Sequence, residues 1–357
     1  MAPSLDGPSG STASWAPRGY AGRLIRDAAL VAAFPWVLTG QSTVTPTDCS
    51  AHRPSQRHHR QVVWRDSATV LVYTRPPSFH AITDVPGALG ASVEEAFRAR
   101  HLPIVLAVAA STLVLIAADE SVLDDSRRMA RRVGLPQNHP STDVRIGAFK
   151  LALPTTVGSG LYFLGDGLTS VAVAAGFATR ATVADDLRAR RVASEVIEAL
   201  IASGTVTQVL KHVAGRQTPS EATVPRGRWR PFPPLGAYNR NVPAYDAFPS
   251  GHLASTMATI TVVALNYPEH HFIWPVGYAT MAALSFAMVN NGVHWASDYP
   301  LALAIGGVIG KVVVDRGRTV VGMPARPATV PIATSIASRV DVGPVLAPGV
   351  IGVRVRF

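Results

Sequence analysis

The sequence predicts an all-α fold: a bundle of about six helices, preceded by an irregular N-terminal region and followed by a short β-like tail. Long apolar segments with few charges recur from about residue 90, as expected for helices that pack against one another. Of the 357 residues, 48% are hydrophobic and only 16% are charged, which is below the usual quarter for a soluble domain. Proline-rich stretches separate several of the apolar segments, and proline interrupts helices.

The chain divides into an irregular N-terminal region, a helical domain and a C-terminal tail, at residues 1–95, 96–318 and 319–357. The tail is rich in valine, proline and glycine, and its last six residues alternate like a strand. In the N-terminal region, the apolar run at 28–39 follows two arginines, which leaves open a secretory signal or an anchor. The apolar, β-branched residues 67–73 predict a short strand.

Six apolar segments predict the helices of the domain. They lie at residues 102–118, 151–179, 193–210, 253–266, 272–290 and 301–314. The first is a 17-residue run without charge, at the lower limit for crossing a bilayer. The charged residues that follow it, at 119–132, predict a solvated helix or loop. Several segments are short and rich in glycine, so we expect close helix packing whether the bundle crosses a membrane or lies beside one.

The formal net charge of +10 comes almost entirely from arginine. The arginines are scattered, and many lie at the ends of apolar segments. Nucleic-acid binding normally uses a concentrated basic stripe or a known module, so it is not expected here. Anionic lipid headgroups match charge of this kind better.

Two short clusters carry residue types that suit a phosphate site. In the first, Lys211 ends an apolar helix, where a cation would meet a phosphate. In the second, Ser250 and Gly251 directly precede an apolar helix. Free backbone N–H groups and a hydroxyl would therefore meet at a helix N-terminus, which is a ready anion site. His252 would lie in the first turn of that helix and point at the bound anion.

A third cluster supplies a second histidine. His294 and Asp298 are four positions apart, so on a helix they would share a face. A carboxylate so placed can hold one imidazole nitrogen and leave the other as a base or nucleophile. Together with His252 these residues would offer three metal ligands, but no fourth ligand supports a metal site, and none is expected.

Each cluster taken alone has a simpler explanation. Residues 249–252 alone are typical of a capped helix start. His294 and Asp298 alone are typical of a surface pair or a buried hydrogen bond. Lys211 alone is typical of a helix end whose long side chain reaches water.

Together, in this order and spacing, the three clusters resemble the type 2 phosphatidic acid phosphatase superfamily, which includes the vanadium haloperoxidases. That pattern is Lys-x6-Arg-Pro, then Pro-Ser-Gly-His, then Ser-Arg-x5-His-x3-Asp. Residues 249–252 match the middle block, His294 and Asp298 match the end of the last, and Lys211 and Pro219 fit the first. The resemblance covers roughly residues 190–315 and implies the helical bundle of that superfamily.

The resemblance implies a phosphatase that works through a phosphohistidine and needs no cofactor. His294 would be the nucleophile, Asp298 would orient it, and His252 would serve as the acid and then the base. The phosphate would be held by the first two clusters, through Lys211, Ser250 and Gly251. It also implies a membrane-associated enzyme that hydrolyses a lipid phosphate or diphosphate, in a bacterial cell envelope with its site facing the periplasm or exterior.

Two positions depart from the superfamily pattern, because Thr218 and Met288 stand where it has arginines. Losing two charge-assisted hydrogen bonds would cost about 3–6 kcal/mol. We hypothesise that Arg216 and one arginine of the proline-rich loop at 225–234 supply the missing guanidinium groups, and that Asn291 donates a neutral hydrogen bond. The loop arginines are Arg226, Arg228 and Arg230.

Two other functions stay open. Without the two arginines, the chain would be a catalytically weak or inactive member that binds lipid phosphates. With vanadate bound to His294, it would be a haloperoxidase, although those enzymes rely on the arginines that are missing here. Phosphate release compared with a His294→Ala variant separates an enzyme from a binder, and cofactor-dependent halide oxidation would reveal a haloperoxidase.

Overall fold

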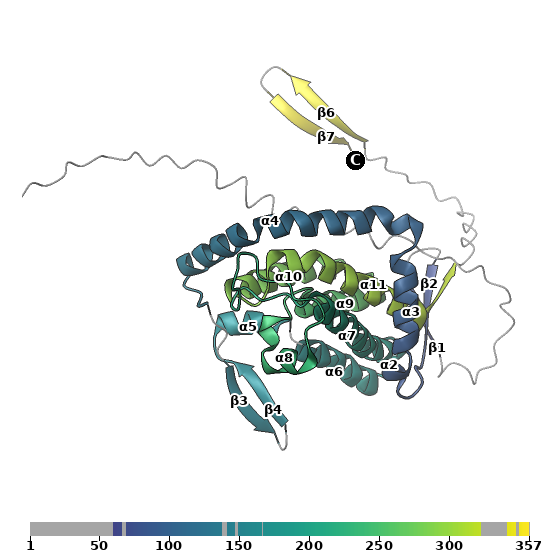
Figure 1. Cartoon of the computed structure of the whole chain (residues 1–357). Coiled ribbons are helices and arrows are strands. Elements are labelled where there is room, and N and C mark those ends of the chain that lie inside the picture. Colours follow the sequence, from purple (N-terminus) through teal and green to yellow (C-terminus); the bar gives the residue numbers. More distant parts are fainter. Residues whose placement is uncertain are drawn as a thin grey trace, which may run out of the picture.

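The chain is described here by a computed structural model that covers residues 60–65, 69–137, 141–146, 149–165, 167–322, 341–347 and 350–356. Helices dominate these residues and pack into one bundle (Figure 1). The prediction of an all-α helical bundle is therefore confirmed. The apolar run at 28–39 lies outside the described residues, so a signal or anchor there stays a prediction.

Three helices form the centre of the bundle, namely α7 (Leu187–Ala214), α9 (Gly251–Asn266) and α11 (Tyr299–Gly317). They pack pairwise, while α6 (Gly167–Val183) covers α7 and α10 (Ile273–Asn290) covers α9 (Figure 1). The core between them is built from small and β-branched side chains, including Val192, Val196, Ala258, Val262 and Val313.

Glycine lets α11 approach α9 closely. A Cβ atom at Gly306 would lie 2.3 Å from the Ala254 carbonyl oxygen, and one at Gly310 would lie 2.8 Å from the Ala258 carbonyl oxygen. Neither contact is possible for a larger residue without a shift of the helix backbone. This confirms the close helix packing that the glycine-rich segments predicted, and it holds the N-terminal ends of both helices in register.

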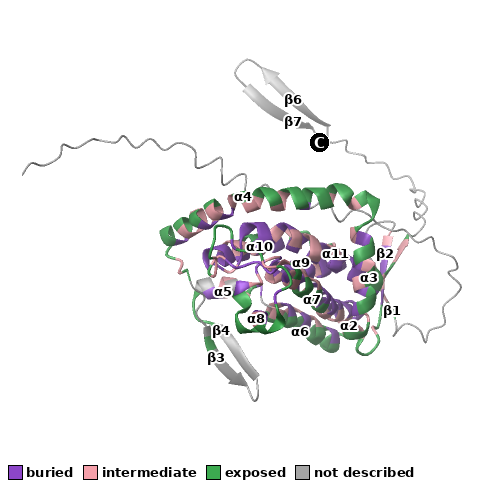
Figure 2. Ribbon diagram, in the orientation of Figure 1, coloured by how far each residue is buried: buried purple, intermediate pink, exposed green. Residues whose placement is uncertain are grey.

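The longest helix, α4 (Leu102–Arg132), lies along α10 and α11 (Figure 1). Both α4 and α11 are long and apolar enough to cross a membrane, but their surroundings differ. The most apolar part of α4 is 11% buried, whereas that of α11 is 78% buried inside the bundle. Figure 2 shows most of α4 exposed. The α4 helix therefore weakly suggests membrane association, and the apolar character of α11 is explained by the core.

The segment at 119–132, predicted to be a solvated helix or loop, continues α4 as regular helix. It is also not uniformly solvated, because Asp119, Leu123 and Ala130 are buried against the bundle. The sequence did not indicate this buried face, because its few positions recur at helical spacing within a segment that is mostly charged.

The part of the N-terminal region that the structure describes, from residue 60 on, contains more regular structure than its composition indicated. Within residues 1–95, expected to be irregular, α2 (His80–Thr83) and most of α3 (Val85–Ala96) are helical, and the short turn η3 (Ala99–His101) leads on to α4. Strand β2 (Thr69–Thr74) confirms the strand predicted at 67–73. It pairs antiparallel with β1 (Arg60–Trp64) on one side and β5 (Thr319–Gly322) on the other.

The apolar segment at 151–179, predicted to be one helix, contains a strand end and two helices. The hairpin of β3 (Ser141–Ile146) and β4 (Phe149–Pro154) comes first, and α5 (Val157–Phe163) and α6 follow. Proline at the end of β4 and glycine between the helices break the run. A Cβ atom at Gly165 would lie 2.9 Å from the His252 Cβ, so this break lets the chain pass beside the candidate site.

The remaining elements are short. Helix α8 (Leu235–Arg240) and the turn η4 (Val242–Ala244) lie in the connection from α7 to α9, and the turn η5 (Ala296–Asp298) leads into α11. In the C-terminal tail, β6 (Asp341–Ala347) and β7 (Val350–Arg356) form an antiparallel hairpin. The strand predicted for the last six residues is confirmed by β7.

Candidate active site

The three sequence clusters meet where α7 ends, α9 begins and α10 passes into α11. The rings of His252 and His294 have centroids 5.9 Å apart and lie nearly perpendicular, at 72°. The backbone N–H of Ser250 donates to the Asp298 carbonyl at 3.1 Å, which ties the start of α9 to the start of α11. Residues far apart in the sequence therefore share one site.

The start of α9 has the features of an anion site. Ser250 is its N-cap, with an extended backbone, and its buried hydroxyl accepts the Leu253 N–H at 3.4 Å. The N–H groups of Gly251 and the first turn have no carbonyl partner within the helix. Together with the helix dipole they create a positive potential at this point. His252 stands in this turn, as the sequence predicted.

Lys211 approaches the start of α9 from the end of α7. A Cβ atom at Gly251 would lie only 3.8 Å from the Lys211 Nζ atom. The ammonium group is nearly buried and donates to the Asp246 carboxylate at 3.1 Å. Asp246 was not singled out in the sequence, because nothing in its neighbourhood marks it as the partner of a lysine 35 positions away.

His294 is held by two acceptors. Its Nδ1 atom lies 2.8 Å from the Ala247 carbonyl oxygen and 3.4 Å from Asp298 Oδ2. A carbonyl oxygen only accepts, so Nδ1 carries the hydrogen and, in the neutral ring, Nε2 carries the lone pair. The sequence indicated Asp298 as the orienting partner. The nearer partner is the Ala247 carbonyl, which no side-chain pattern could reveal.

His294 and Asp298 do not share a face of a helix, contrary to the prediction. Helix α10 ends at Asn290, Gly292 adopts φ 70, and Trp295 is extended before the short turn η5. The two residues come together because this turn folds back, with the Trp295 N–H donating to Asp298 Oδ2 at 2.7 Å. The four-residue spacing of His294 and Asp298 therefore brings them together through this turn, and not through a shared helix face as predicted.

Arg216 does not lie where it can bind a phosphate, and the structure corrects that expectation. Its guanidinium is fully buried and donates to Asp298, Asp119 and Ser297, each at 2.7 Å. The Arg226 carbonyl accepts from Nε and Nη2 at 3.3 and 2.9 Å. A guanidinium has five N–H donors, and these five bonds use them. Arg216 therefore supports Asp298 from behind.

Gly215 explains the inward direction of Arg216. It ends α7 with a left-handed φ of 54°, and its N–H donates to the Lys211 carbonyl at 2.8 Å. A Cβ atom there would lie 1.8 Å from the Arg230 carbonyl oxygen, so only glycine fits this closely packed turn. Because the turn reverses the chain direction, the next side chain enters the interior.

Asp119 is a site residue that the sequence analysis missed. It lies in the middle of α4 and is 1% exposed. Its carboxylate accepts from the Arg216 guanidinium at 2.7 Å, and from the Ser297 hydroxyl and N–H at 2.6 and 3.0 Å. It stands first in a charged run, so it was counted with the solvated residues. Its position directly after a long uncharged run was the only available signal.

The loop arginines divide into two groups. Arg226 and Arg228 have exposed side chains, and their backbone groups bind Arg216 and Gln217. Arg230 is half-buried, with its guanidinium 5.7 Å from the centre of the Tyr245 ring. Tyr245 directly precedes Asp246, the partner of Lys211. Arg230 is thus the loop arginine whose contact lies beside the Lys211 ion pair.

The two positions without arginine are buried. Thr218 is 3% exposed and shares a hydrogen bond with the Ser220 hydroxyl at 3.0 Å. Met288 is fully buried in an apolar cluster with Leu253 and Leu284. Asn291 caps the end of α10 and its Nδ2 atom is buried with no hydrogen-bond partner among the described residues, so this donor is available.

A model of the PAP2 superfamily matches residues 193–319. This match supports membership of the PAP2 superfamily for that segment of the chain. The matched segment runs from the first turns of α7 to the end of α11 and so contains all three clusters. No curated protein and no solved structure matches the chain significantly. Membership of the PAP2 superfamily supports a hydrolase of the phosphatase type.

The α4 helix, with Asp119, contributes to the site from outside the matched segment.

Proposed function

We propose that this PAP2 protein is a membrane-associated phosphatase that hydrolyses a lipid phosphate or diphosphate through a phosphohistidine. The observation that supports this most is the pair of perpendicular imidazoles, His252 and His294, 5.9 Å apart beside a helix N-terminus. At this separation the two rings lie edge to face, so one phosphoryl group bound beside their common edge would be within reach of both. The fixed Nδ1–H of His294 further supports it, because it leaves Nε2 as the nucleophilic nitrogen.

The reaction takes two steps. In the first, the Nε2 lone pair of His294 forms a bond to phosphorus while the bond to the leaving oxygen breaks, and protonated His252 gives that oxygen its proton. In the second, neutral His252 takes a proton from water, the water oxygen bonds to phosphorus, and the phosphorus–nitrogen bond breaks. Both histidines return to their starting protonation states.

Charge on the phosphoryl oxygens is stabilised by two sources that lie together. One is the start of α9, whose N–H groups and dipole favour an anion. The other is Lys211, which exchanges Asp246 for the phosphate when the substrate binds. Arg230 supplies the guanidinium that Arg216 cannot. Its guanidinium lies 5.7 Å from the centre of the Tyr245 ring, and Tyr245 directly precedes Asp246, the ion-pair partner of Lys211, which supports this role. Asn291 adds a neutral donor.

A lipid substrate suits the exposed apolar surface of α4. Large apolar side chains on this helix face outward over several turns, namely Leu102, Val105, Leu106, Leu113 and Val114. Such a surface is unfavourable in water and favourable in the apolar part of a bilayer. Asp119 on the same helix belongs to the site network, so the site lies close to where this surface ends.

The test is phosphate release by the purified full chain in detergent, with phosphatidate compared with a soluble phosphate monoester. Phosphatidate should be the better substrate. The His252→Ala variant should lose roughly 10²- to 10⁴-fold in kcat/KM, and His294→Ala should fall to background. His271→Ala, at an exposed histidine outside the site, should equal the wild type. Undiminished turnover in His294→Ala rejects the proposal.

A second function is favoured by Met288 and Thr218, which are buried where the superfamily pattern has arginines and offer no positive charge to a phosphate. The protein would then bind lipid phosphates without turning them over. In that case the wild type and His294→Ala bind phosphatidate vesicles equally, Lys211→Ala weakens the binding, and none of the three releases phosphate. Release that depends on His294 excludes this alternative.

A further inference from the structure

A second cluster of chemically active side chains lies at the other end of the bundle. It consists of His80 at the start of α2, Asp84 between α2 and α3, and Glu198 on α7. One ligand atom from each lies within 4.8 Å of the other two, and His80 Nε2 lies 3.7 Å from Glu198 Oε2. Lys211 lies thirteen positions after Glu198 on α7, a distance of about 20 Å along the helix.

Glu198 is a buried carboxylate without a hydrogen-bond donor. Its side chain is 1% exposed, and neither carboxylate oxygen has a hydrogen-bond partner among the described residues. Transfer of an unpaired carboxylate from water to a protein interior costs several kcal/mol. The group therefore needs either a proton or a cation, and it faces a histidine and a second carboxylate.

Among the charged neighbours of Glu198, His80 pairs with it only when the imidazole is protonated, and the two nearby guanidinium groups bind elsewhere. Arg316 binds Asp84, with Nη2 at 2.8 and 3.0 Å from the two carboxylate oxygens. Arg191, on the same face of α7, donates to the Thr74 carbonyl and hydroxyl at 3.3 and 3.4 Å. Glu195, one turn earlier, accepts from the Asn266 amide at 2.6 Å. The two guanidinium groups lower the affinity for a cation here, but neither donates to Glu198.

We propose that His80, Asp84 and Glu198 form a binding site for a divalent transition-metal ion such as Zn²⁺ or Mn²⁺. One imidazole and two carboxylates, from residues 80–84 and from α7, are a ligand set that such ions take. On a tetrahedral ion, two ligand atoms are about 3.3 Å apart for bonds of about 2.0 Å. The 3.7 Å separation of His80 Nε2 and Glu198 Oε2 is close to this value.

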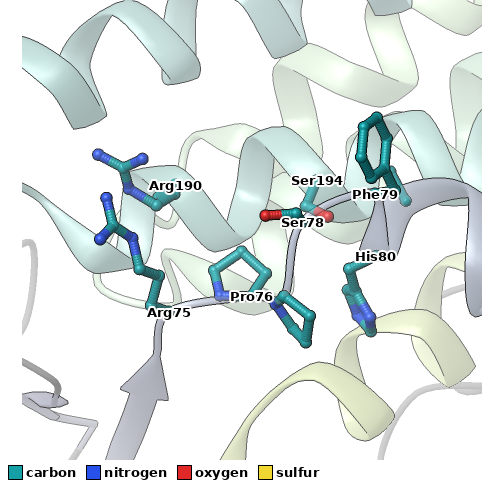
Figure 3. Close-up of a pocket in the computed structure, with 9 residues that line it drawn as sticks. Arg75, Pro76, Ser78, Phe79, His80, Arg190 and Ser194 are labelled. Atoms are coloured by element: carbon teal, nitrogen blue, oxygen red, sulfur yellow. The ribbon is translucent and has the colours of Figure 1, made fainter.

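A cavity borders one of the three proposed ligands. His80 is part of the lining of a cavity of about 850 Å³, between the segment that follows β2 and the first turns of α7 (Figure 3). We expect a water molecule to complete the coordination. The ion ties α2 and α3 to α7, and it takes no part in hydrolysis because the histidine pair lies at the other end of α7.

The experiment uses the purified full chain, stripped of metal with a chelator and then dialysed. ZnCl₂ and MnCl₂ are added separately, and calorimetric titration and thermal unfolding are recorded. We expect one ion per chain and a rise in Tm of several degrees at saturation. The Glu198→Gln and His80→Ala variants should each lose at least tenfold in affinity and most of the rise in Tm.

Three controls make the result decisive. Glu94→Gln and His271→Ala change exposed residues of the same types and should bind metal like the wild type. His294→Ala should also bind like the wild type, so the outcome is independent of the proposed phosphatase activity. Without metal, Glu198→Gln should melt at or above the wild-type temperature, because an amide replaces an unpaired carboxylate.

Two results would overturn the proposal. One is the absence of stoichiometric binding of either ion to the wild type, which would mean that a proton, and not a metal ion, neutralises Glu198. The other is binding that stays undiminished in both Glu198→Gln and His80→Ala, which would place the metal elsewhere in the chain.

Discussion

Two regions along α7 differ in how their buried charges are paired. Just beyond its C-terminal end, the buried Arg216 guanidinium donates to two carboxylates, a hydroxyl and a carbonyl. Nearer its N-terminal end, the buried Glu198 has no donor, and Glu195 has one oxygen without a partner. A fully paired charge stabilises one arrangement of its neighbours. A buried charge without a partner instead indicates a proton or a ligand.

This difference distinguishes groups that hold the fold in place from groups that can bind a ligand. The Arg216 network links α4, the loop after α7 and η5, so it fixes Asp298 behind His294. It has no donor left for a substrate. Groups that a ligand can use must be incompletely paired, as the first turn of α9 and the Glu198 carboxylate are. The following predictions test this distinction, from the largest effect to the smallest.

Arg216→Ala should have the largest effect on folding. It leaves Asp119 and Asp298 buried without their common donor, which should cost about 3–5 kcal/mol of unfolding free energy. Arg228→Ala, at an exposed arginine of the same loop, should change stability by less than about 0.5 kcal/mol. Chemical denaturation of both variants measures this. Equal stabilities would show that the buried network does not hold the site together.

Arg230→Ala should affect catalysis and leave folding unchanged. Loss of one charge-assisted hydrogen bond to the phosphate should lower kcat/KM by about 10- to 100-fold. Initial rates with phosphatidate, compared with Arg228→Ala, measure the effect. An unchanged kcat/KM would show that the site works without a loop guanidinium, with Lys211 and the α9 N-terminus as its main positive charges.

Glu195 should make folding stability depend on pH. Burial raises the pKa of Glu195 to about 8, from an ordinary value of 4.5. As pH rises from about 5 to 8, the unfolded chain releases this proton while the folded chain keeps it, so stability falls across that range. We expect a loss of about 3–4 kcal/mol in metal-free buffer.

Glu195→Gln isolates that contribution. The variant cannot titrate at this position, so its unfolding free energy should fall less between pH 5 and pH 8 than that of the wild type. Denaturation at both pH values compares the two proteins. The same loss in the variant would mean that other groups set the pH dependence.

Much of the fold could be predicted because helices with apolar faces have a strong period. The segments at 193–210, 253–266, 272–290 and 301–314 correspond to α7, α9, α10 and α11. The segment at 151–179 failed because apolar composition alone does not distinguish a strand from a helix, and one proline and two glycines divide it. Helices α2 and α3 were missed because their residues lack a long apolar period.

The site could be predicted in part, because spacing in the sequence locates residues but not the direction of their side chains. His252, His294 and Lys211 meet at the helix ends, where the motifs lie in register. Arg216 was misjudged because a left-handed glycine turns it inward. Asp119 was missed because its partners are supplied by segments almost a hundred or more residues away, and one sequence carries no signal of such pairing.

The most direct test of the account is detection of phosphate bonded to His294. An aryl phosphate needs no protonation of its leaving group, so His252→Ala should still form the intermediate and hydrolyse it slowly. After an alkaline quench, peptide mass spectrometry of this variant should find a phosphoryl group on His294, and none when His294 is also changed to alanine. Aryl phosphate hydrolysis with no phosphoryl group on His294, or with the group on another residue, would contradict the account.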